Sequence, residues 1–110
     1  MPHIRARGID VSALTSVADD IVESIAEVTD TPADHFTVEH IPSEFIVKGG
    51  ASPAYPFIEI LWFDRGQEVK TSVAIIVDDI LRPIVGTDKD ITVVFSDLRG
   101  QDYYENKTHF

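Results

Sequence analysis

The chain has 110 residues, of which 44% are apolar and 25% are charged, and it contains no cysteine. This length fits one domain with one core that needs no disulfide or metal to hold it. The lack of cysteine excludes disulfides, thiolate metal sites and cysteine nucleophiles. Nineteen acidic residues against nine basic ones give a net charge of −10, which argues against partners such as nucleic acid or an anionic membrane surface.

The apolar segments are too short to cross a membrane. The longest, such as 75–77, fall far below the roughly 20 residues that span a bilayer. The first residues also lack the apolar run of a signal peptide. We therefore expect a cytoplasmic protein that does not associate with membranes.

The first half of the chain predicts a strand, a helix and a second strand. Residues 3–7 alternate in polarity, as a half-buried strand does. Apolar residues then recur every three or four positions from Val11 to Val28, which indicates an amphipathic helix. Asp10 is suited to cap its start, and 30–32 should stop it. The next strand is expected over 36–41.

The second half repeats this order. Asp64 and Gln67 have the spacing of a capping box at the start of the second helix. Pro83 is expected to end that helix, because proline removes a backbone donor and clashes with the preceding turn. The predicted strand, helical stripe and strand of this half cover 57–63, 69–81 and 91–95.

An offset of about 54 to 56 residues superimposes the halves, placing Pro2 on Pro56 and Thr37 on Thr92. We interpret the chain as one domain with two pseudo-repeats, a linker and a tail: 2–47, 56–98, 48–55 and 99–110.

Two strand–helix–strand units predict an α+β fold, because each unit forms a parallel strand pair with a right-handed crossover. The result is a four-stranded mixed sheet with both helices on one face. The other face would be half polar and half apolar, which suits neither open water nor a dry core, so we expect subunits to pack there in an oligomer. The alternation assigns to this face His3, Arg5, Arg7, Thr37, Glu39, Phe57, Glu59, Leu61, Thr92, Val94 and Ser96.

Pro2 is the leading candidate for a catalytic residue. Methionine aminopeptidases remove the initiator methionine before a small residue, which would give Pro2 a free secondary amine. An α-amino group has a pKa of about 7.7–8.0, and burial lowers it by disfavouring the charged form. Such an amine can serve as a base near neutral pH. The alternative is that Pro2 only begins a strand, where its missing N–H costs nothing.

The proline-led β-α-β repeat resembles the tautomerase superfamily, which includes 4-oxalocrotonate tautomerase, malonate semialdehyde decarboxylase and macrophage migration inhibitory factor (MIF). The resemblance covers residues 2 to about 98, and the later segments look like a bacterial branch of the superfamily. The resemblance is based on these segments: Pro2-His3-Ile4, the helix 11–28, Pro32 before 36–39, Lys48-Gly49-Gly50, 56–68 and 103–106.

The resemblance implies a homotrimer with sites at subunit boundaries and an isomerase reaction that uses no cofactor and no metal. Pro2 would shuttle a proton between carbon and oxygen of a small enol or keto acid. Arg65 would hold the substrate carboxylate at the second strand-to-helix turn, where helix N–H groups also favour an anion. The alternative for Arg65 is a solvated residue of the first helical turn.

Further candidates for substrate binding lie near Pro2 or in the tail. Arg5 and Arg7 suit carboxylate recognition by bidentate pairing. We nevertheless favour a structural ion-pair network for them, because Arg5 lies opposite Glu59 in the repeat and Glu39 shares their face. In the tail, Tyr103 is suited to orient a carbonyl or a water, and Glu105 to act as a second acid or base. The alternative is that the tail packs on a neighbouring subunit. The candidate aromatic walls are Phe45, Phe57 and Trp62.

Two other functions remain open. The strand 36–41 lacks the arginine that family members often place there, which favours a catalytically silent oligomer that binds a ligand or a protein. A ferredoxin-like regulatory domain also has two β-α-β units, but it predicts a monomer or dimer and no role for the N-terminus. The histidines have no metal-ligand spacing; they are His3, His35, His40 and His109.

Overall fold

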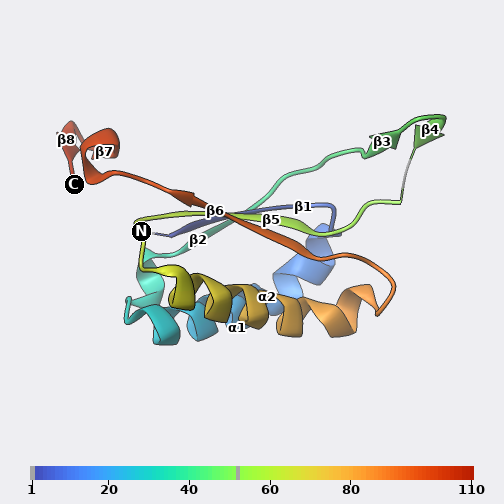
Figure 1. Ribbon diagram of the computed structural model, residues 1–110, viewed down its shortest axis with the longest axis horizontal. Helices are drawn as coiled ribbons and strands as arrows, with labels where there is room; N and C mark the ends of the chain where they lie inside the picture. The colour runs from blue at the N-terminus through green and yellow to red at the C-terminus, as the bar shows by residue number, and fades with distance from the viewer. Residues whose placement is uncertain (1, 52) are drawn as a thin grey trace.

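The structure, a computed structural model, describes residues 2–51 and 53–110. Its main sheet has four strands in the order β2-β1-β5-β6. The outer pairs β1–β2 and β5–β6 are parallel, and the central pair β1–β5 is antiparallel. This α+β architecture confirms the predicted fold (Figure 1). The strands are β1 (His3–Arg7), β2 (Thr37–His40), β5 (Phe57–Trp62) and β6 (Thr92–Asp97).

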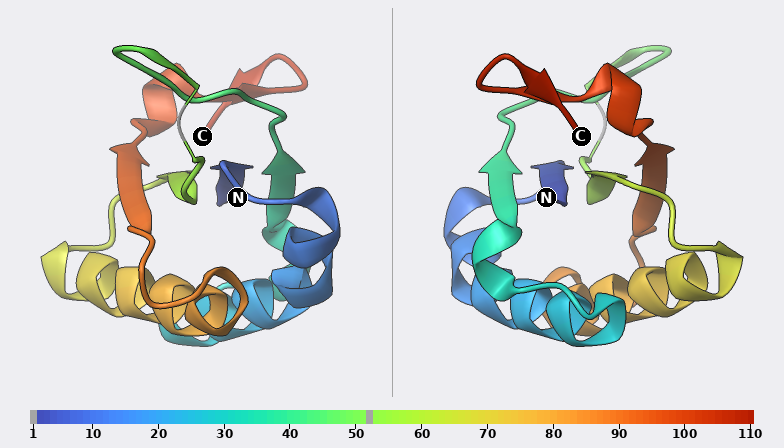
Figure 2. Two further views of the ribbon diagram at one scale, coloured as in Figure 1. Left: turned by 90° about the vertical axis from the view of Figure 1, so that its right-hand side faces the viewer. Right: turned by 90° about the vertical axis from the view of Figure 1, so that its left-hand side faces the viewer.

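Both long helices, α1 (Val11–Thr29) and α2 (Gln67–Val85), cover one face of this sheet (Figure 2). Alternation along the central strands sends every second side chain into the layer between sheet and helices. The core is therefore built from the inner positions of β1 and β5 and from the apolar stripes of the helices. Its fully buried members include Ile4, Ala6, Ile25, Ile60, Trp62, Val73, Val77 and Leu81.

The internal repeat is visible in the backbone hydrogen bonds. The N–H of Thr37 donates to the carbonyl of Pro2 at 3.2 Å, and the N–H of Thr92 donates to the carbonyl of Pro56 at 3.0 Å. These equivalent bonds start the two parallel pairs at the same register. The aligned prolines of the sequence are thus structurally equivalent, at opposite ends of the antiparallel pair.

Helix α1 begins and ends as its sequence predicts. The carboxylate of Asp10 accepts hydrogen bonds from the N–H groups of Ser12 and Ala13 at 3.0 and 3.2 Å, which caps the first turn. Asp30 follows the last turn in the left-handed region, with φ of 51°. That conformation turns the chain away from the helix axis.

Helix α2 departs from the prediction at both ends. It begins at Gln67, after Gly66, so Gln67 is its first residue rather than its third, and the predicted capping box does not form. The carboxylate of Asp64 instead accepts from the N–H of Gly66 at 2.9 Å. Pro83 lies inside the helix, which continues to Val85. Proline removes only one helical donor, and the N–H of Gly86 still closes the last turn on the carbonyl of Arg82 at 2.9 Å.

Two hairpins absent from the prediction rise from opposite ends of the sheet, on the side away from the helices (Figures 1 and 2). The predicted linker contains β3 (Ile46–Val47) and β4 (Gly50–Ala51), and the tail contains β7 (Tyr104–Glu105) and β8 (Thr108–His109). Strands of two residues carry no detectable alternation, so the periodicity could not predict them. The remaining elements are the 3-10 helices η1 (Ala33–His35) and η2 (Gly100–Asp102).

Within the described ranges, no helix is long and apolar enough to cross a membrane.

Candidate active site

A polar network crosses the sheet face that the helices leave open, which we call the outer face. The two ring nitrogens of His3 contact the hydroxyl of Thr37 and the carboxylate of Glu39, the latter at 2.8 Å. The Nε of Arg5 lies 3.5 Å from the same Glu39 carboxylate. The hydrogen bond from His3 is the main cause that lowers the pKa of Glu39, and the positive charge of Arg5 adds to it.

Arg5 connects this network to the second half of the sheet. Its Nη1 donates to a carboxylate oxygen of Glu59 at 3.4 Å, and the hydroxyl of Ser96 donates to the other oxygen of Glu59 at 3.2 Å. The strand register pairs Arg5 with both Glu39 and Glu59. Arg5 therefore sits in the ion-pair network that the sequence offered as its alternative role, with two carboxylates already beside its charge.

A hollow of about 380 Å³ lies beside Thr37, the hydrogen-bond partner of Pro2, and we call it the Pro2 hollow, although Pro2 is not one of its lining residues. The side chain of Pro2 is fully buried. Thr37, whose N–H donates to the carbonyl of Pro2, is one of the residues that line the hollow. Met1, whose removal the proposed chemistry requires, lies outside the described residues. The lining residues are Asp34, His35, Thr37, Tyr103, Glu105 and Phe110.

The tail forms one wall of the Pro2 hollow by packing on its own chain. The rings of Phe63, Tyr103 and Phe110 contact one another, with centroids 4.9–5.7 Å apart. Gly100 permits this packing, because a Cβ at that position would lie 2.6 Å from the carbonyl oxygen of Phe110. The tail thus brings Tyr103 and Glu105 to the end of the sheet where Pro2 lies.

Trp62 and Arg65 face the helix layer. The indole of Trp62 is fully buried in the core, and its Nε1 donates to the carboxylate of Asp97 at 2.9 Å. Arg65 donates to the carbonyl of Thr29, at the end of α1, at 3.3 Å. Neither residue lines the Pro2 hollow. Arg65 therefore holds the end of one helix to the turn before the other.

Three other predicted binding residues gather at the opposite end of the outer face. Arg7 ends β1 and is the register partner of Phe57. Both line a separate hollow of about 470 Å³ together with Phe45. The structure thus divides the predicted substrate-binding residues between the two ends of the sheet.

Comparison with known proteins shows to which family this chain belongs. The family model described as "Domain of unknown function (DUF1904)" matches residues 1–109. The chain belongs to the DUF1904 family. A crystal structure of a DUF1904 domain from Sebaldella termitidis ATCC 33386 shares 34% identity over 100% of both chains, with a TM-score of 0.92. Comparison with curated proteins gave no match.

The fold of this DUF1904 chain is that of the tautomerase superfamily. A fused 4-OT, described as an asymmetric trimer, matches 97% of this chain and 94% of its own at 14% identity, with a TM-score of 0.79. A MIF-like protein from Entamoeba histolytica matches 99% and 98% at 15% identity, with a TM-score of 0.77. At these identities the likeness shows the fold alone, and it confirms the resemblance found in the sequence.

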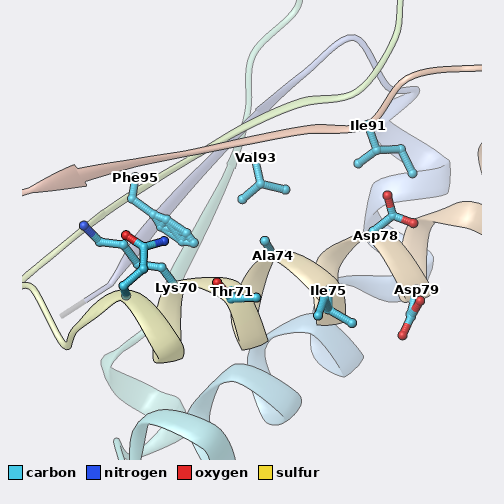
Figure 3. A pocket seen from close by; sticks show the side chains of 10 residues that line it. Lys70, Thr71, Ala74, Ile75, Asp78, Asp79, Ile91, Val93 and Phe95 are labelled. Atoms are coloured by element: carbon cyan, nitrogen blue, oxygen red, sulfur yellow. The ribbon is translucent and has the colours of Figure 1, made fainter.

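A further hollow of this DUF1904 chain, about 570 Å³, lies between α2 and β6 rather than near Pro2. Figure 3 shows Val93 and Phe95 of β6 facing α2 across it. At one end, the Nζ of Lys70 forms an ion pair with the Oδ2 of Asp97 at 2.6 Å. At the other end, the Nη2 of Arg82 forms an ion pair with the Oδ2 of Asp78 at 2.9 Å. Because these two charges are already paired, we do not place the chemistry there.

Sequence reasoning missed several residues at the Pro2 hollow. Asp34 and His35 reach it from η1, and Phe63 and Phe110 support its tail wall. Only the unusual aromatic content of the tail signalled this arrangement in advance. Within residues 2–51 and 53–110, no group of three or more histidine or acidic side chains is arranged to hold a metal ion.

Proposed function

We propose that this protein is a cofactor-independent tautomerase, an isomerase that acts on a small enol or keto acid. In this proposal Met1 is removed, the amine of Pro2 is the general base, and the protein works as a cytoplasmic homotrimer. The observation that carries it is the position of Pro2, which is fully buried at the start of a central strand and is hydrogen-bonded to Thr37, a residue that lines a hollow. The fold shared with a trimeric fused 4-OT supports it.

Burial is what makes the Pro2 amine useful. An exposed α-amino group is mostly protonated at neutral pH, whereas burial disfavours its charged form and lowers its pKa. The neutral amine takes a proton from the enol hydroxyl or from the carbon next to the carbonyl. The resulting ammonium group returns that proton to the other atom, so the reaction balances with no oxidant or cofactor.

Two tail residues are suited to assist Pro2. The Tyr103 hydroxyl is a neutral donor that suits the substrate carbonyl oxygen, where negative charge develops during enolisation. Glu105, an exposed residue at the same hollow, supplies a second group that can accept a proton. Arg65 has a smaller part in this proposal than in the sequence analysis, because its guanidinium is used at the end of α1.

A second candidate function, a catalytically silent oligomer that binds a ligand, is favoured by one observation. The Pro2 hollow is lined by the acids Asp34 and Glu105 and, among the described residues, by no lysine or arginine. Arg5, the nearest arginine along β1, contacts two carboxylates of the outer face. A substrate carboxylate would then need its cation from a neighbouring subunit.

Alkylation by bromopyruvate tests the role of Pro2. The chain has no cysteine, so the most reactive competing nucleophile is absent. We expect one adduct, on Pro2, whose rate follows a pKa well below that of an exposed prolyl amine. Peptide mass spectrometry after labelling across pH measures both the position and the rate.

Two variants complete this test. Pro56→Ala changes the structurally equivalent proline, whose nitrogen is within the chain, and should leave labelling of Pro2 unchanged. Pro2→Ala leaves a primary amine and should lower the turnover of enol acids by about a hundredfold, a typical contribution of a general base. Retained Met1 or an unreactive Pro2 amine would contradict the enzyme proposal. Labelling of Pro2 without turnover of any enol acid would favour the silent oligomer.

A further inference from the structure

The hollow at the far end of the outer face has the chemistry of a binding site separate from Pro2. We call it the Arg7 hollow; its volume is about 470 Å³, within the range of small-molecule pockets. Strand β1 separates it from Pro2 by five residues, or roughly 17 Å at the usual rise per residue. Its lining includes Arg7, Glu44, Phe45, Tyr55 and Phe57.

The aromatic walls of the Arg7 hollow are held in place by the backbone of Gly8. A Cβ on Gly8 would lie 1.9 Å from the carbonyl oxygen of Tyr55 and 3.1 Å from the ring of Phe45. Both residues therefore pack closely against Gly8 because it has no side chain. The two rings also pack edge to face, with centroids 5.0 Å apart. The walls are therefore formed before any ligand arrives, which reduces the entropy lost on binding.

Unlike the other arginines, Arg7 has no side-chain partner among the residues that the structure describes. The side chains of Arg5, Arg65, Arg82 and Arg99 all make hydrogen bonds. That of Arg7 makes no hydrogen bond or ion pair with residues 2–51 or 53–110, although its charge helps lower the pKa of Glu39. A half-buried arginine that lies beside aromatic rings and has no partner among the described residues is suited to bind an external anion.

The type of anion follows from the geometry. A guanidinium presents a planar set of donors that matches a carboxylate in a bidentate manner. Phe57 faces the same side as Arg7, its register partner, and the rings of Phe45 and Tyr55 complete an apolar wall. We propose that the Arg7 hollow binds a small carboxylate that carries an apolar, planar body. This site goes beyond the proposed function and requires no chemistry at Pro2.

Phenylacetate and its neutral amide, phenylacetamide, test this proposal as matched probes. We expect phenylacetate to shift the backbone amide signals of Gly8 and Phe57 in NMR spectra, while the signals near Tyr103 stay in place. Phenylacetamide should bind at least about tenfold more weakly, because it lacks the charge that pairs with Arg7. Equal affinity for the two probes would overturn the proposal, as would the absence of phenylacetate binding at millimolar concentration.

Three variants separate the role of Arg7 from general effects. Arg7→Gln should weaken phenylacetate binding about tenfold or more, whereas Arg99→Gln, at an exposed arginine that pairs with Asp102, should have no effect. Glu44→Gln removes a negative charge from the rim of the hollow and should tighten binding. Unchanged binding in Arg7→Gln would overturn the proposal. Bromopyruvate labelling of Pro2 is read separately, so failure here leaves the tautomerase proposal standing.

Discussion

Asp97 shows how one exposed carboxylate can support the core. One of its oxygens accepts from the buried Nε1 of Trp62 at 2.9 Å, and the other accepts from Lys70 at 2.6 Å. The hydrogen bond from Lys70 is the main cause that lowers the pKa of Asp97, and that from Trp62 acts in the same direction. The carboxylate thus provides the acceptor that a buried indole needs.

Asp97→Ala should lower the free energy of unfolding by about 1–3 kcal/mol, because it leaves the buried Nε1 of Trp62 without an acceptor. Asp97→Asn keeps an oxygen for the indole and should cost less. Trp62 is the only tryptophan, so its fluorescence during denaturation reports the loss directly. Asp102→Ala removes a solvent-exposed pair with Arg99 and serves as the control. Equal losses in Asp97→Ala and Asp102→Ala would contradict the assigned role.

The lowered pKa values of Asp97 and Glu39 predict the pH dependence of stability. A carboxyl group with a lowered folded-state pKa stabilises the fold above its unfolded pKa, and the contribution is lost as pH falls through the folded value. The ordinary values are 3.8 for Asp97 and 4.5 for Glu39. We expect denaturant midpoints to fall as pH drops below about 4. Asp97→Asn should show a shallower fall, and an identical slope would contradict the assignment.

At the site, the sequence predicted the residues whose positions depend on strand periodicity and on the repeat. The alternation of β1 placed Arg5 on the outer face, and the repeat placed Glu59 beside it, as the structure shows. The contact between Arg65 and Thr29 could not be predicted, because it depends on how the two helices pack. The approach of Tyr103 to the Pro2 end depends on tail packing, which has no periodic signal.

At the scale of elements, Gly8 connects β1 to α1 and supports Tyr55. Its φ of +78° is unfavourable for other residues, and a Cβ would overlap the Tyr55 carbonyl. Gly86 has a similar φ of +88° but open space around it. Gly8→Ala should therefore destabilise the protein by roughly 1–3 kcal/mol more than Gly86→Ala, because only Gly8→Ala adds overpacking to strain. Chemical denaturation of both variants measures the difference, and equal losses would show that the overlap is relieved at no cost.

The long elements were predictable and the short ones were not. Each main strand and helix has a pattern that spans several side chains, so its position follows from burial alone. The β7–β8 turn instead depends on Asn106 and Lys107, which both have positive φ. Asparagine tolerates that conformation, and its presence was the available signal for a hairpin. Helix α2 continues past Pro83 because the N–H of Gly86 still donates to the carbonyl of Arg82 and completes the last turn.

At the scale of the whole molecule, the two faces of the sheet differ in what covers them. The helices bury the inner face, whereas the outer face carries the polar network and apolar side chains such as Val94, which is 39% exposed. Hairpins β3–β4 and β7–β8 rise on this side at opposite ends (Figure 1). A face that is half polar and half apolar suits neither open water nor a dry core, which supports subunit contacts across it, as in the proposed homotrimer.

Val94→Asp tests whether the outer face is the subunit interface. Its carboxylate would lie beside Glu59, its register partner, and burying this extra charge in an interface is costly unless it is paired. Light scattering coupled to size exclusion should find wild type at three times the chain mass of 12.2 kDa and Val94→Asp at one. Ile75→Asp is the matched control, because Ile75 is 55% exposed but lies on α2, on the opposite side of the molecule. A Val94→Asp trimer, or dissociation in Ile75→Asp alone, would move the interface away from the outer face.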